Sequence, residues 1–365
     1  MARIQFILKT REALYTDETA NSYERDPVSG LQYLSSGLLN SAHFVEQMLA
    51  ARLGHITDLS HAVNNNCIDR QITVFKPDIC VIEAYWVVPE KFTILKKLHP
   101  KVIWVIRNHS ALPFAANEGV VMDWTLRYMD YENVLSCSND LRTDAEMRAI
   151  IAAYKPKWSN KKLNETVHYL PNYYPLDFTP HCPLPESNTL NISCFGALRP
   201  LKNHLMQAVA AIKLARKLGK KLRFHINGTR IEMKGEPIQR NLSKMFGLLP
   251  DYELVEHSWL AHDKFIALLR QMDLAMQVSF TETFNIVTAD AVVNGVPVIT
   301  SPDIVWIDSQ FHADPNSSDQ MVTVMERTLA MAKQNAHWQQ NMFGLRVFDE
   351  ASVKIWNKFI KSHTS

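Results

Sequence analysis

Apolar residues occur along the first half of the chain in short runs that alternate with longer amphipathic stretches. The short runs, which predict buried strands, are Ile4–Lys9, Pro77–Trp86, Val102–Ile106, Val134–Cys137 and Val167–Leu170. The stretches that predict helices are Gly37–Leu53, Ile68–Phe75 and a segment from about Asn139. Strands separated by helices in this way favour a parallel sheet covered on both faces. This half therefore predicts one doubly wound α/β domain.

A second series of the same kind begins near residue 190. Its predicted strands are Asn191–Phe195, Leu222–Asn227, Tyr252–His257, Leu274–Val278 and Val296–Ile299. Its predicted helices are His204–Leu218, Ile238–Phe246, His262–Met272, Phe284–Val293 and Pro315–Gln334. Five prolines within residues 171–185 exclude a helix or an inner strand there. We therefore expect domains at 1–170 and 190–345, a linker at 171–189, and a final aromatic-rich helix within 346–365.

Composition, charge and cysteine content limit which kinds of protein this chain can be. Of the 365 residues 47% are hydrophobic, which is enough for two cores and disfavours wholesale disorder. The formal net charge of +2 does not by itself indicate a nucleic-acid partner. The five cysteines are odd in number and lack a C-x-x-C spacing, so we expect reduced thiols in a cytoplasmic protein. The sequence shows neither a signal peptide nor an apolar run of transmembrane length.

The segment from Phe280 to Thr300 is the most informative about function. It carries two carboxylates, Glu282 and Asp290, in and around a predicted apolar helix that ends at Asn294-Gly295. Eight helical residues turn by about 800°, so both acids would lie on roughly the same side, about 12 Å apart along the axis. This separation is roughly the length of a nucleotide-sugar. One acid would then hold sugar hydroxyls and the other the ribose, while the first helical turn offers N–H groups to a diphosphate.

This segment resembles the donor-binding motif of GT-B glycosyltransferases. It is most similar to the large retaining family that includes bacterial lipid mannosyltransferases, sucrose synthases and glycogen synthases. In that family an acid, seven residues and a second acid precede a small-residue helix and a Gly-x-Pro-Val strand. Two departures stand in this chain: Asp290 replaces the usual Glu, and Asn285 replaces the usual Gly. The resemblance implies two tandem Rossmann-like domains with an interdomain cleft, and a C-terminal crossover helix that Phe348, Trp356 and Phe359 would anchor on the N-terminal domain.

A second segment, Cys194–Asn203, resembles the family sequence Gly-Arg-Leu-x-x-x-Lys-Gly. Gly196 and Lys202 match in place, whereas the family arginine is Ala197 here and Arg199 stands two positions later. Cations are needed at such a site because a departing nucleoside diphosphate develops negative charge as the sugar–phosphate bond breaks. We therefore expect Lys202 to act as a point charge and Arg199 as a fork on the phosphate oxygens.

The resemblance implies further donor contacts around these two segments. The candidates are strand-end and helix-start residues, namely Gly228, Trp259, Ser279, Thr283, Phe284 and Asn285. Gly228 permits close approach of the backbone to a ligand. Trp259 is expected to stack on the nucleobase. Ser279 fits the strand-end serine that precedes the acidic motif in the family.

The N-terminal domain supplies the expected acceptor side. His109 follows a predicted buried strand, and the carboxyl ends of parallel strands are where such sheets bind ligands. The family often places a histidine on such a loop, so we count His109 with Lys202, Arg199 and Glu282 as catalytic candidates. The other acceptor-side candidates are Arg107, for phosphate, Ser36 and Gly37, for a loop over the diphosphate, and Glu118.

These expectations converge on a glycosyltransferase that moves a sugar from a nucleotide-diphospho-sugar to a hydroxyl with retention of configuration. A UDP-sugar is the favoured donor. No cofactor or obligatory metal is expected, because the sequence has no Asp-x-Asp motif or zinc-type histidine pair and GT-B relatives generally use protein cations. Absence of Gly-x-Gly-x-x-Gly disfavours a dinucleotide oxidoreductase.

The acceptor stays open between a glycan, a lipid-linked sugar and a modified base in DNA. Some viral enzymes of this architecture glucosylate hydroxymethylated pyrimidines, and the basic clusters Lys155–Lys162 and Lys213–Arg223 permit a polyanionic acceptor. Two alternatives belong to other classes: a non-catalytic nucleotide-sugar-binding scaffold and a GT-B sugar epimerase.

Overall fold

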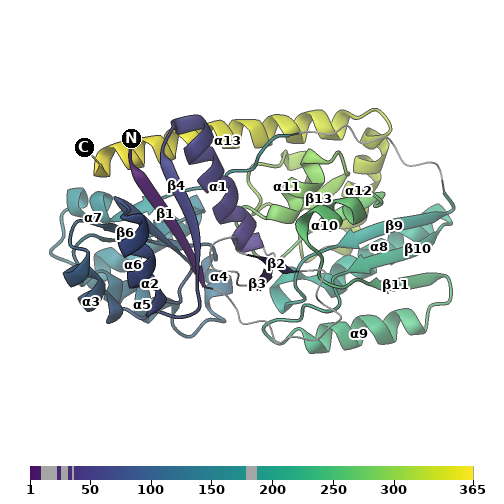
Figure 1. Ribbon diagram of the computed structural model, residues 1–365. Coiled ribbons are helices and arrows are strands. Elements are labelled where there is room, and N and C mark those ends of the chain that lie inside the picture. Colours follow the sequence, from purple (N-terminus) through teal and green to yellow (C-terminus); the bar gives the residue numbers. More distant parts are fainter. Residues whose placement is uncertain (10–22, 26–31, 35–36, 178–186, 365) are drawn as a thin grey trace. The chain divides into compact units, whose positions relative to one another are not determined.

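The computed structural model describes residues 1–9, 23–25, 32–34, 37–177 and 187–364 (Figure 1). It contains two compact units. Apart from the N-terminal region, the first comprises Arg25–Pro175 and Phe348–Ser365, and the second comprises Leu176–Val347. The chain therefore leaves the first unit within the proline-rich segment and returns to it inside the last helix.

The first unit is built on a six-stranded parallel sheet with the order β4-β1-β5-β6-β7-β8. The strands are β1 (Arg3–Lys9), β4 (Ile56–Ala62), β5 (Ile79–Glu83), β6 (Ile103–Asn108), β7 (Val134–Ser138) and β8 (Val167–Tyr169). The helices are α1 (Gly37–Leu53), α2 (Cys67–Phe75), α3 (Lys91–Leu98), α4 (Leu112–Ala115), α5 (Val121–Tyr128), α6 (Leu141–Tyr154) and α7 (Asn160–Thr166). Two short strands, β2 (Tyr23–Arg25) and β3 (Gln32–Leu34), form a separate sheet.

Alternate residues of the central strands face two different cores, as expected for a sheet covered on both sides. In β1, Ile4, Phe6 and Leu8 pack in a cluster with α1 and the last helix, whereas Ile7 packs with α2, α3 and α5. The edge strand β4, which the sequence pattern does not indicate, has the sequence ITDLSHA and is mostly half-buried. Its polar residues interrupt the apolar run by which the inner strands are recognised.

The second unit has a five-stranded parallel sheet with the order β11-β10-β9-β12-β13. The strands are β9 (Thr189–Cys194), β10 (Lys221–Ile226), β11 (Tyr252–Glu256), β12 (Leu274–Gln277) and β13 (Val298–Thr300). The α-helices are α8 (His204–Leu218), α9 (Glu236–Gly247), α10 (His262–Leu269), α11 (Ile286–Val293) and α12 (Ser318–Ala332). Two 3-10 turns, η2 (Pro200–Lys202) and η3 (Ser309–Phe311), follow β9 and β13. Two doubly wound parallel domains are thus confirmed.

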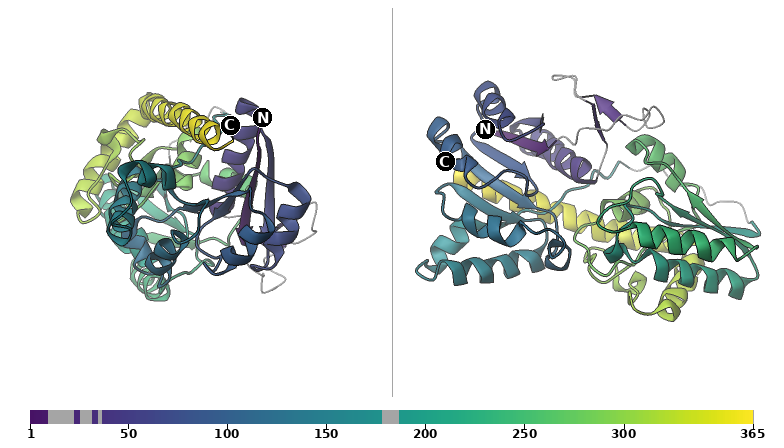
Figure 2. Two further views of the ribbon diagram at one scale, coloured as in Figure 1. Left: turned by 90° about the vertical axis from the view of Figure 1, so that its left-hand side faces the viewer. Right: turned by 90° about the horizontal axis from the view of Figure 1, so that it is seen from below.

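The last helix, α13, runs from Ala336 to His363 and begins before the range 346–365 that was predicted for it. Its C-terminal half packs on the first unit: the Trp356 ring lies 6.1 Å from the Phe6 ring, and its Nε1 donates to the Pro171 carbonyl at 2.9 Å. Phe359 joins the same core. The end of this helix and the start of β1 lie side by side in all views (Figures 1 and 2). The expected return to the N-terminal domain is confirmed.

Among the described helices, none combines the length and the apolar character that crossing a membrane requires. The four cysteines in the described ranges, Cys67, Cys80, Cys137 and Cys194, are free thiols.

Candidate active site

Lys202 and Glu282 form an ion pair across 80 positions of sequence in the second unit. Lys202 ends η2, after β9, and Glu282 lies in the loop after β12. A backbone hydrogen bond joins these two loops: the Phe280 N–H donates to the Leu201 carbonyl at 2.9 Å. The Lys202 and Glu282 side chains are 18% and 9% exposed. Two residues that the sequence nominates separately therefore meet at the carboxyl edge of the sheet.

Asn203 sets the direction of the Lys202 loop. It has φ of 60°, in the left-handed region that few residues other than glycine and asparagine adopt. Its Nδ2 donates to the carbonyls of Val278, at 3.1 Å, and Pro315, at 2.8 Å. Asn203 stands where the resembling family has glycine after its lysine, so the asparagine supplies the same backbone geometry and adds two hydrogen bonds.

The helix after Glu282 begins later than predicted. Asn285 has φ of 58° and caps α11, accepting a hydrogen bond from the Thr288 N–H at 2.9 Å. Because a right-handed helix cannot include this conformation, Glu282 lies in the preceding loop. The predicted helical geometry of Glu282 and Asp290, about 800° of rotation on one helix, is therefore wrong.

The residues just before α11 are partly structural. Phe284 is buried, its ring packs on Trp306 at 5.5 Å between centroids, and its carbonyl accepts from Trp306 Nε1. The Asn285 side chain also donates to Gln277 Oε1 at 2.9 Å. Thr283 is half-buried in the same loop. The Phe284 side chain thus belongs to the core.

Asp290 has a partner that the sequence analysis does not nominate. Its Oδ1 lies 2.7 Å from His262 Nε2, at the start of α10, and the carboxylate is 1% exposed. The predicted ribose contact by Asp290 remains a prediction. In the structure the Asp290 carboxylate is buried and contacts His262, whose side chain is 28% exposed.

Arg199 is tied to a second unpredicted carboxylate, Glu232. Arg199 Nε lies 3.4 Å from Glu232 Oε2, and Arg230 Nε lies 2.7 Å from Oε1 of the same residue. The Arg230 guanidinium stacks over Trp259 at 4.1 Å from the ring centroid. Glu232 thus joins the Arg199 loop to the loop that carries the predicted base-stacking tryptophan.

The three small candidates of the second unit have different roles. Gly196 has φ of 122°, which strongly favours glycine, and its N–H donates to Asn227 Oδ1 at 2.8 Å. A Cβ at Gly228 would lie 2.8 Å from Glu256 Cβ, so this glycine makes room for a neighbouring strand. Ser279 is buried, and its hydroxyl has no hydrogen-bond partner among the described residues.

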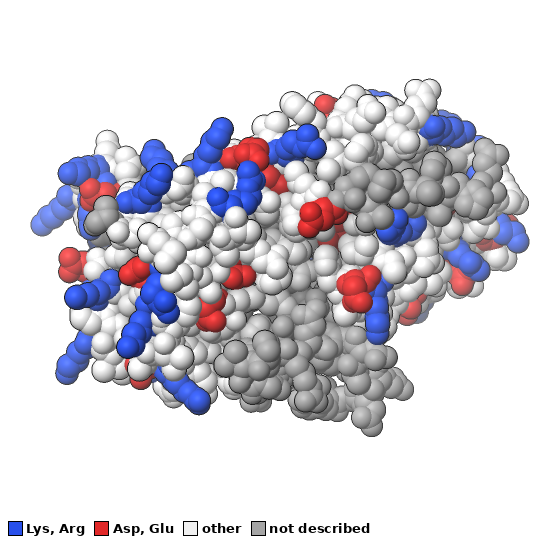
Figure 3. Space-filling model, turned by 45° about the horizontal axis from the view of Figure 1, so that its top comes forward, with Lys and Arg blue, Asp and Glu red and all other residues white. Residues whose placement is uncertain are grey.

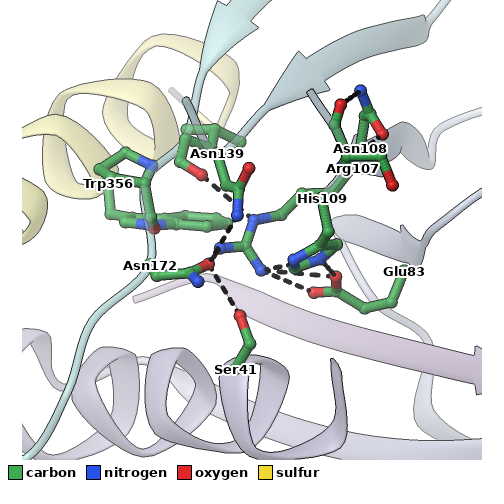
Figure 4. A network of polar contacts seen from close by, with 11 residues as sticks. Ser41, Glu83, Arg107, Asn108, His109, Asn139, Asn172 and Trp356 are labelled. Carbon is green, nitrogen blue, oxygen red and sulfur yellow. Dashed lines mark hydrogen bonds and ion pairs between the residues drawn. The ribbon is translucent and has the colours of Figure 1, made fainter. Parts of the chain in front are cut away.

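In the first unit, His109 belongs to a buried charged network with Arg107 and Glu83 (Figure 4). Arg107 Nη1 donates to Glu83 Oε1 at 3.1 Å, and His109 Nε2 contacts Glu83 Oε2. Glu83 and Arg107 have no exposed side-chain area, whereas His109 is 15% exposed. Sequence reasoning missed Glu83, although a single carboxylate at the end of an apolar strand is a usable signal.

The Arg107 side chain is fully buried, and its guanidinium contacts several groups of the protein. Its guanidinium donates to the Asn172 side chain and, at 3.2 Å, to the Leu170 carbonyl, and it lies 5.6 Å from the Trp356 ring centroid (Figure 4). Asn172 also accepts from the Ser41 hydroxyl at 2.7 Å. The expected contact of Arg107 with a phosphate stays a prediction, and in the structure the buried guanidinium is engaged by groups of the protein.

The structure describes two of the three remaining acceptor-side candidates. Gly37 is the first residue of α1, and Ser36 falls outside the described residues. Glu118 lies between α4 and α5, with its N–H donating to the Ala115 carbonyl at 2.9 Å. In the described ranges, no group of three or more His, Cys, Asp or Glu side chains has the arrangement of a metal site.

Solved structures of similar fold span the whole chain. OtsA, in its apo form, has a TM-score of 0.66 at 11% identity and covers 100% of this chain and 99% of its own. Sucrose-phosphate synthase from Thermosynechococcus elongatus has a TM-score of 0.62 at 13% identity, with 99% of both chains covered.

A third similar structure is an alpha-glucosyltransferase in complex with UDP and a 13-mer DNA containing an HMU base. It has a TM-score of 0.61 at 11% identity and covers 100% of both chains. At these identities the likeness shows the GT-B fold alone. No curated protein matches the sequence.

A family match comes from the sequence itself. Residues 158–344, just over half of the chain, match the family described as "Family 4 Glycosyltransferase in conflict systems". The match includes Lys202, Glu282 and Asp290. The chain therefore belongs to this family and is a glycosyltransferase of the GT-B fold.

Proposed function

We propose that this glycosyltransferase moves a sugar from a nucleotide-diphospho-sugar to a hydroxyl acceptor with retention of anomeric configuration. The observation that carries the proposal is the Lys202–Glu282 pair at the carboxyl edge of the second sheet. Lys202 neutralises the departing diphosphate, and Glu282 accepts hydrogen bonds from sugar hydroxyls. The pair keeps both charges compensated until the donor contacts them.

Retention follows from a same-face displacement. The bond from the anomeric carbon to the diphosphate oxygen breaks, and the acceptor oxygen bonds to that carbon from the same side. The acceptor proton passes to a phosphate oxygen of the leaving group, so atoms and charge balance without a protein nucleophile. Lys202 and Arg199 stabilise the charge that develops on the diphosphate.

The other contacts hold the donor in place. Asp290, with His262 beside it, binds the ribose, and Trp259 stacks on the base, with UDP favoured. His109 contacts a sugar hydroxyl. The protein cations remove the need for an obligatory metal, so turnover should persist in excess EDTA. We also propose a cytoplasmic location, where free cysteines such as the four described ones stay reduced.

A panel of UDP-, GDP- and ADP-sugars, each offered with and without glycan, lipid-linked and DNA acceptors, tests the proposal. Nucleoside diphosphate release that depends on an acceptor, with an α-linked product from an α-linked donor, is the expected result. Release with epimerisation of the free sugar would indicate an epimerase. Binding of UDP without any release would indicate a non-catalytic scaffold. An inverted product would contradict retention.

DNA carrying a hydroxymethylated base is the second candidate acceptor. The DNA-bound alpha-glucosyltransferase shares the fold, and Lys157, Lys161 and Lys162 are exposed around the partly buried Trp158. On the face shown in Figure 3, however, cationic side chains are interspersed with acidic ones. Acceptor binding that weakens steeply with salt would favour DNA, whereas salt-insensitive turnover of small glycans would exclude it as the main acceptor.

A further inference from the structure

We propose that Glu83 is a positioning residue for His109: its carboxylate accepts a hydrogen bond from Nε2–H and fixes the imidazole in that tautomer. Nδ1 is then the acceptor atom of the ring. This inference rests on the proposed function only where it concerns turnover, because the tautomer is a property of the protein alone.

Strand register creates the network. Glu83 is the last residue of β5 and pairs with Arg107 on the neighbouring β6. Residues two apart in an extended chain point to the same face of a sheet, so His109 follows Arg107 on the side that Glu83 occupies. The three side chains therefore converge at the carboxyl edge of the first sheet, as Figure 4 shows.

Arg107 keeps Glu83 ionised. Burial by itself raises the pKa of the Glu83 carboxyl, but the positive charge of Arg107 and the hydrogen bonds from Arg107 and His109 outweigh it and hold the pKa below its usual value. The Leu170 carbonyl, the Asn172 side chain and the Trp356 ring in turn hold Arg107 in place. Glu83 thus acts only as an acceptor.

The neighbours of Nε2 decide which ring nitrogen carries the proton. Burial and the Arg107 charge lower the pKa of His109 despite the opposing effect of Glu83, so the imidazole is neutral near pH 7. Arg107 Nη1, which can only donate, is 3.5 Å from Nε2, whereas Glu83 Oε2 is in direct contact with it. A lone pair on Nε2 would face the carboxylate and be repelled. The proton therefore lies on Nε2, and Nδ1 carries the acceptor lone pair of the ring.

Glu83→Gln replaces one carboxylate oxygen by an NH₂ group and tests which ring nitrogen of His109 carries the proton. The amide oxygen should turn to the charged Arg107, which leaves the amide NH₂ to donate to His109 Nε2 and moves the ring proton to Nδ1. ¹⁵N NMR of histidine-labelled protein reads the tautomer, with the His109 signals assigned by their loss in His109→Gln. In the unmodified protein we expect a protonated Nε2 and an unprotonated Nδ1. The opposite assignment there overturns the proposal even if Glu83→Gln does not fold.

Turnover provides the second readout. Glu83→Gln should lower kcat by about 10- to 100-fold, with little change in KM for the donor, because the proper acceptor atom is lost. His109→Ala should lower kcat at least as much, and adding Glu83→Gln to it should cause no further loss. Glu350→Gln, in an exposed ion pair with Arg52, is the matched control and should behave as the unmodified protein.

Two outcomes separate this inference from the proposed function. Additive losses in the double variant, with the fold intact by circular dichroism, would mean that Glu83 does not act through His109. Absence of sugar transfer from any donor, together with the expected tautomer, would overturn the proposed function and leave the positioning of His109 intact.

Discussion

Charged residues of the proposed donor site have partners within the protein. Lys202 is paired with Glu282, Arg199 with Glu232, and Asp290 with His262. Each pair compensates a charge that is largely removed from water and holds the side chain in one orientation. The site is in this sense preorganised: a diphosphate that binds to Lys202 replaces one anion by another, without moving the cation far.

Lys202→Ala should lower kcat by a factor of about 10² or more, because a single charge-stabilising group is removed from the leaving diphosphate. Steady-state release of nucleoside diphosphate measures the effect. Lys217→Ala is the control, since Lys217 pairs with Glu326 on the surface and is 60% exposed. Equal rates for Lys202→Ala and Lys217→Ala would remove Lys202 from the site.

At the level of single elements, the start of α11 depends on Asn285. Asn285 provides its cap, a hydrogen bond to Gln277 and a left-handed backbone. Asn285→Gly keeps the backbone conformation but loses both side-chain contacts, at a cost of about 1–2 kcal/mol of unfolding free energy. Asn285→Ala should cost about 1 kcal/mol more, because it adds left-handed strain. Urea denaturation of both variants measures the difference, and a more stable alanine variant would contradict it.

In α13, Asp349 makes stability depend on pH. Burial raises its pKa to about 8 from the usual 3.8, although the Tyr174 N–H and the Arg52 charge oppose the shift. A raised carboxyl pKa gives stability that is present below about pH 4 and is lost as pH rises toward 8, because the folded state binds the extra proton.

Asp349→Asn should abolish this contribution. Between pH 5 and 8 the unfolding free energy of the unmodified protein should fall by up to about 1.4 kcal/mol per pH unit relative to the variant. Denaturation at several pH values measures the slope. Asp319→Asn, at a carboxylate that is 84% exposed, should keep the slope of the unmodified protein. Parallel curves for Asp349→Asn and the unmodified protein would show that Asp349 is ionised throughout.

The sequence pattern predicts those helices and strands whose own residues form a recognisable run of apolar positions. β5 and β6 are apolar runs and were predictable, whereas β4 was not, since pairs of polar residues separate its apolar residues and give neither an apolar run nor a strict alternation. The start of α11 depends on the φ of Asn285, which the residue type permits but does not require.

Contacts between distant residues were not predictable from the pattern. Glu83 meets Arg107 through the register of β5 and β6, and His262 meets Asp290 through the packing of two helices. A single sequence shows neither. Lys202 and Glu282 could be named in advance, because each lies in a short segment that resembles a family motif.

For the whole molecule, the described fold consists of two parallel-sheet units, with α13 beginning in the second and ending in the first. The family match begins at residue 158 and includes the second sheet. The proposed donor residues Lys202, Glu282 and Asp290 all lie in the second unit, whereas His109 and Glu83 lie in the first. We therefore expect donor affinity and acceptor turnover to respond to different sets of substitutions.

Diffraction from crystals soaked with a UDP-sugar tests the central claim most directly. We predict that the diphosphate lies within hydrogen-bond distance of Lys202 Nζ and the turn before α11, that the sugar contacts Glu282, and that the ribose lies beside Asp290. A donor bound elsewhere, with the Lys202–Glu282 pair unchanged and Asp290 still covered by His262, would contradict the account.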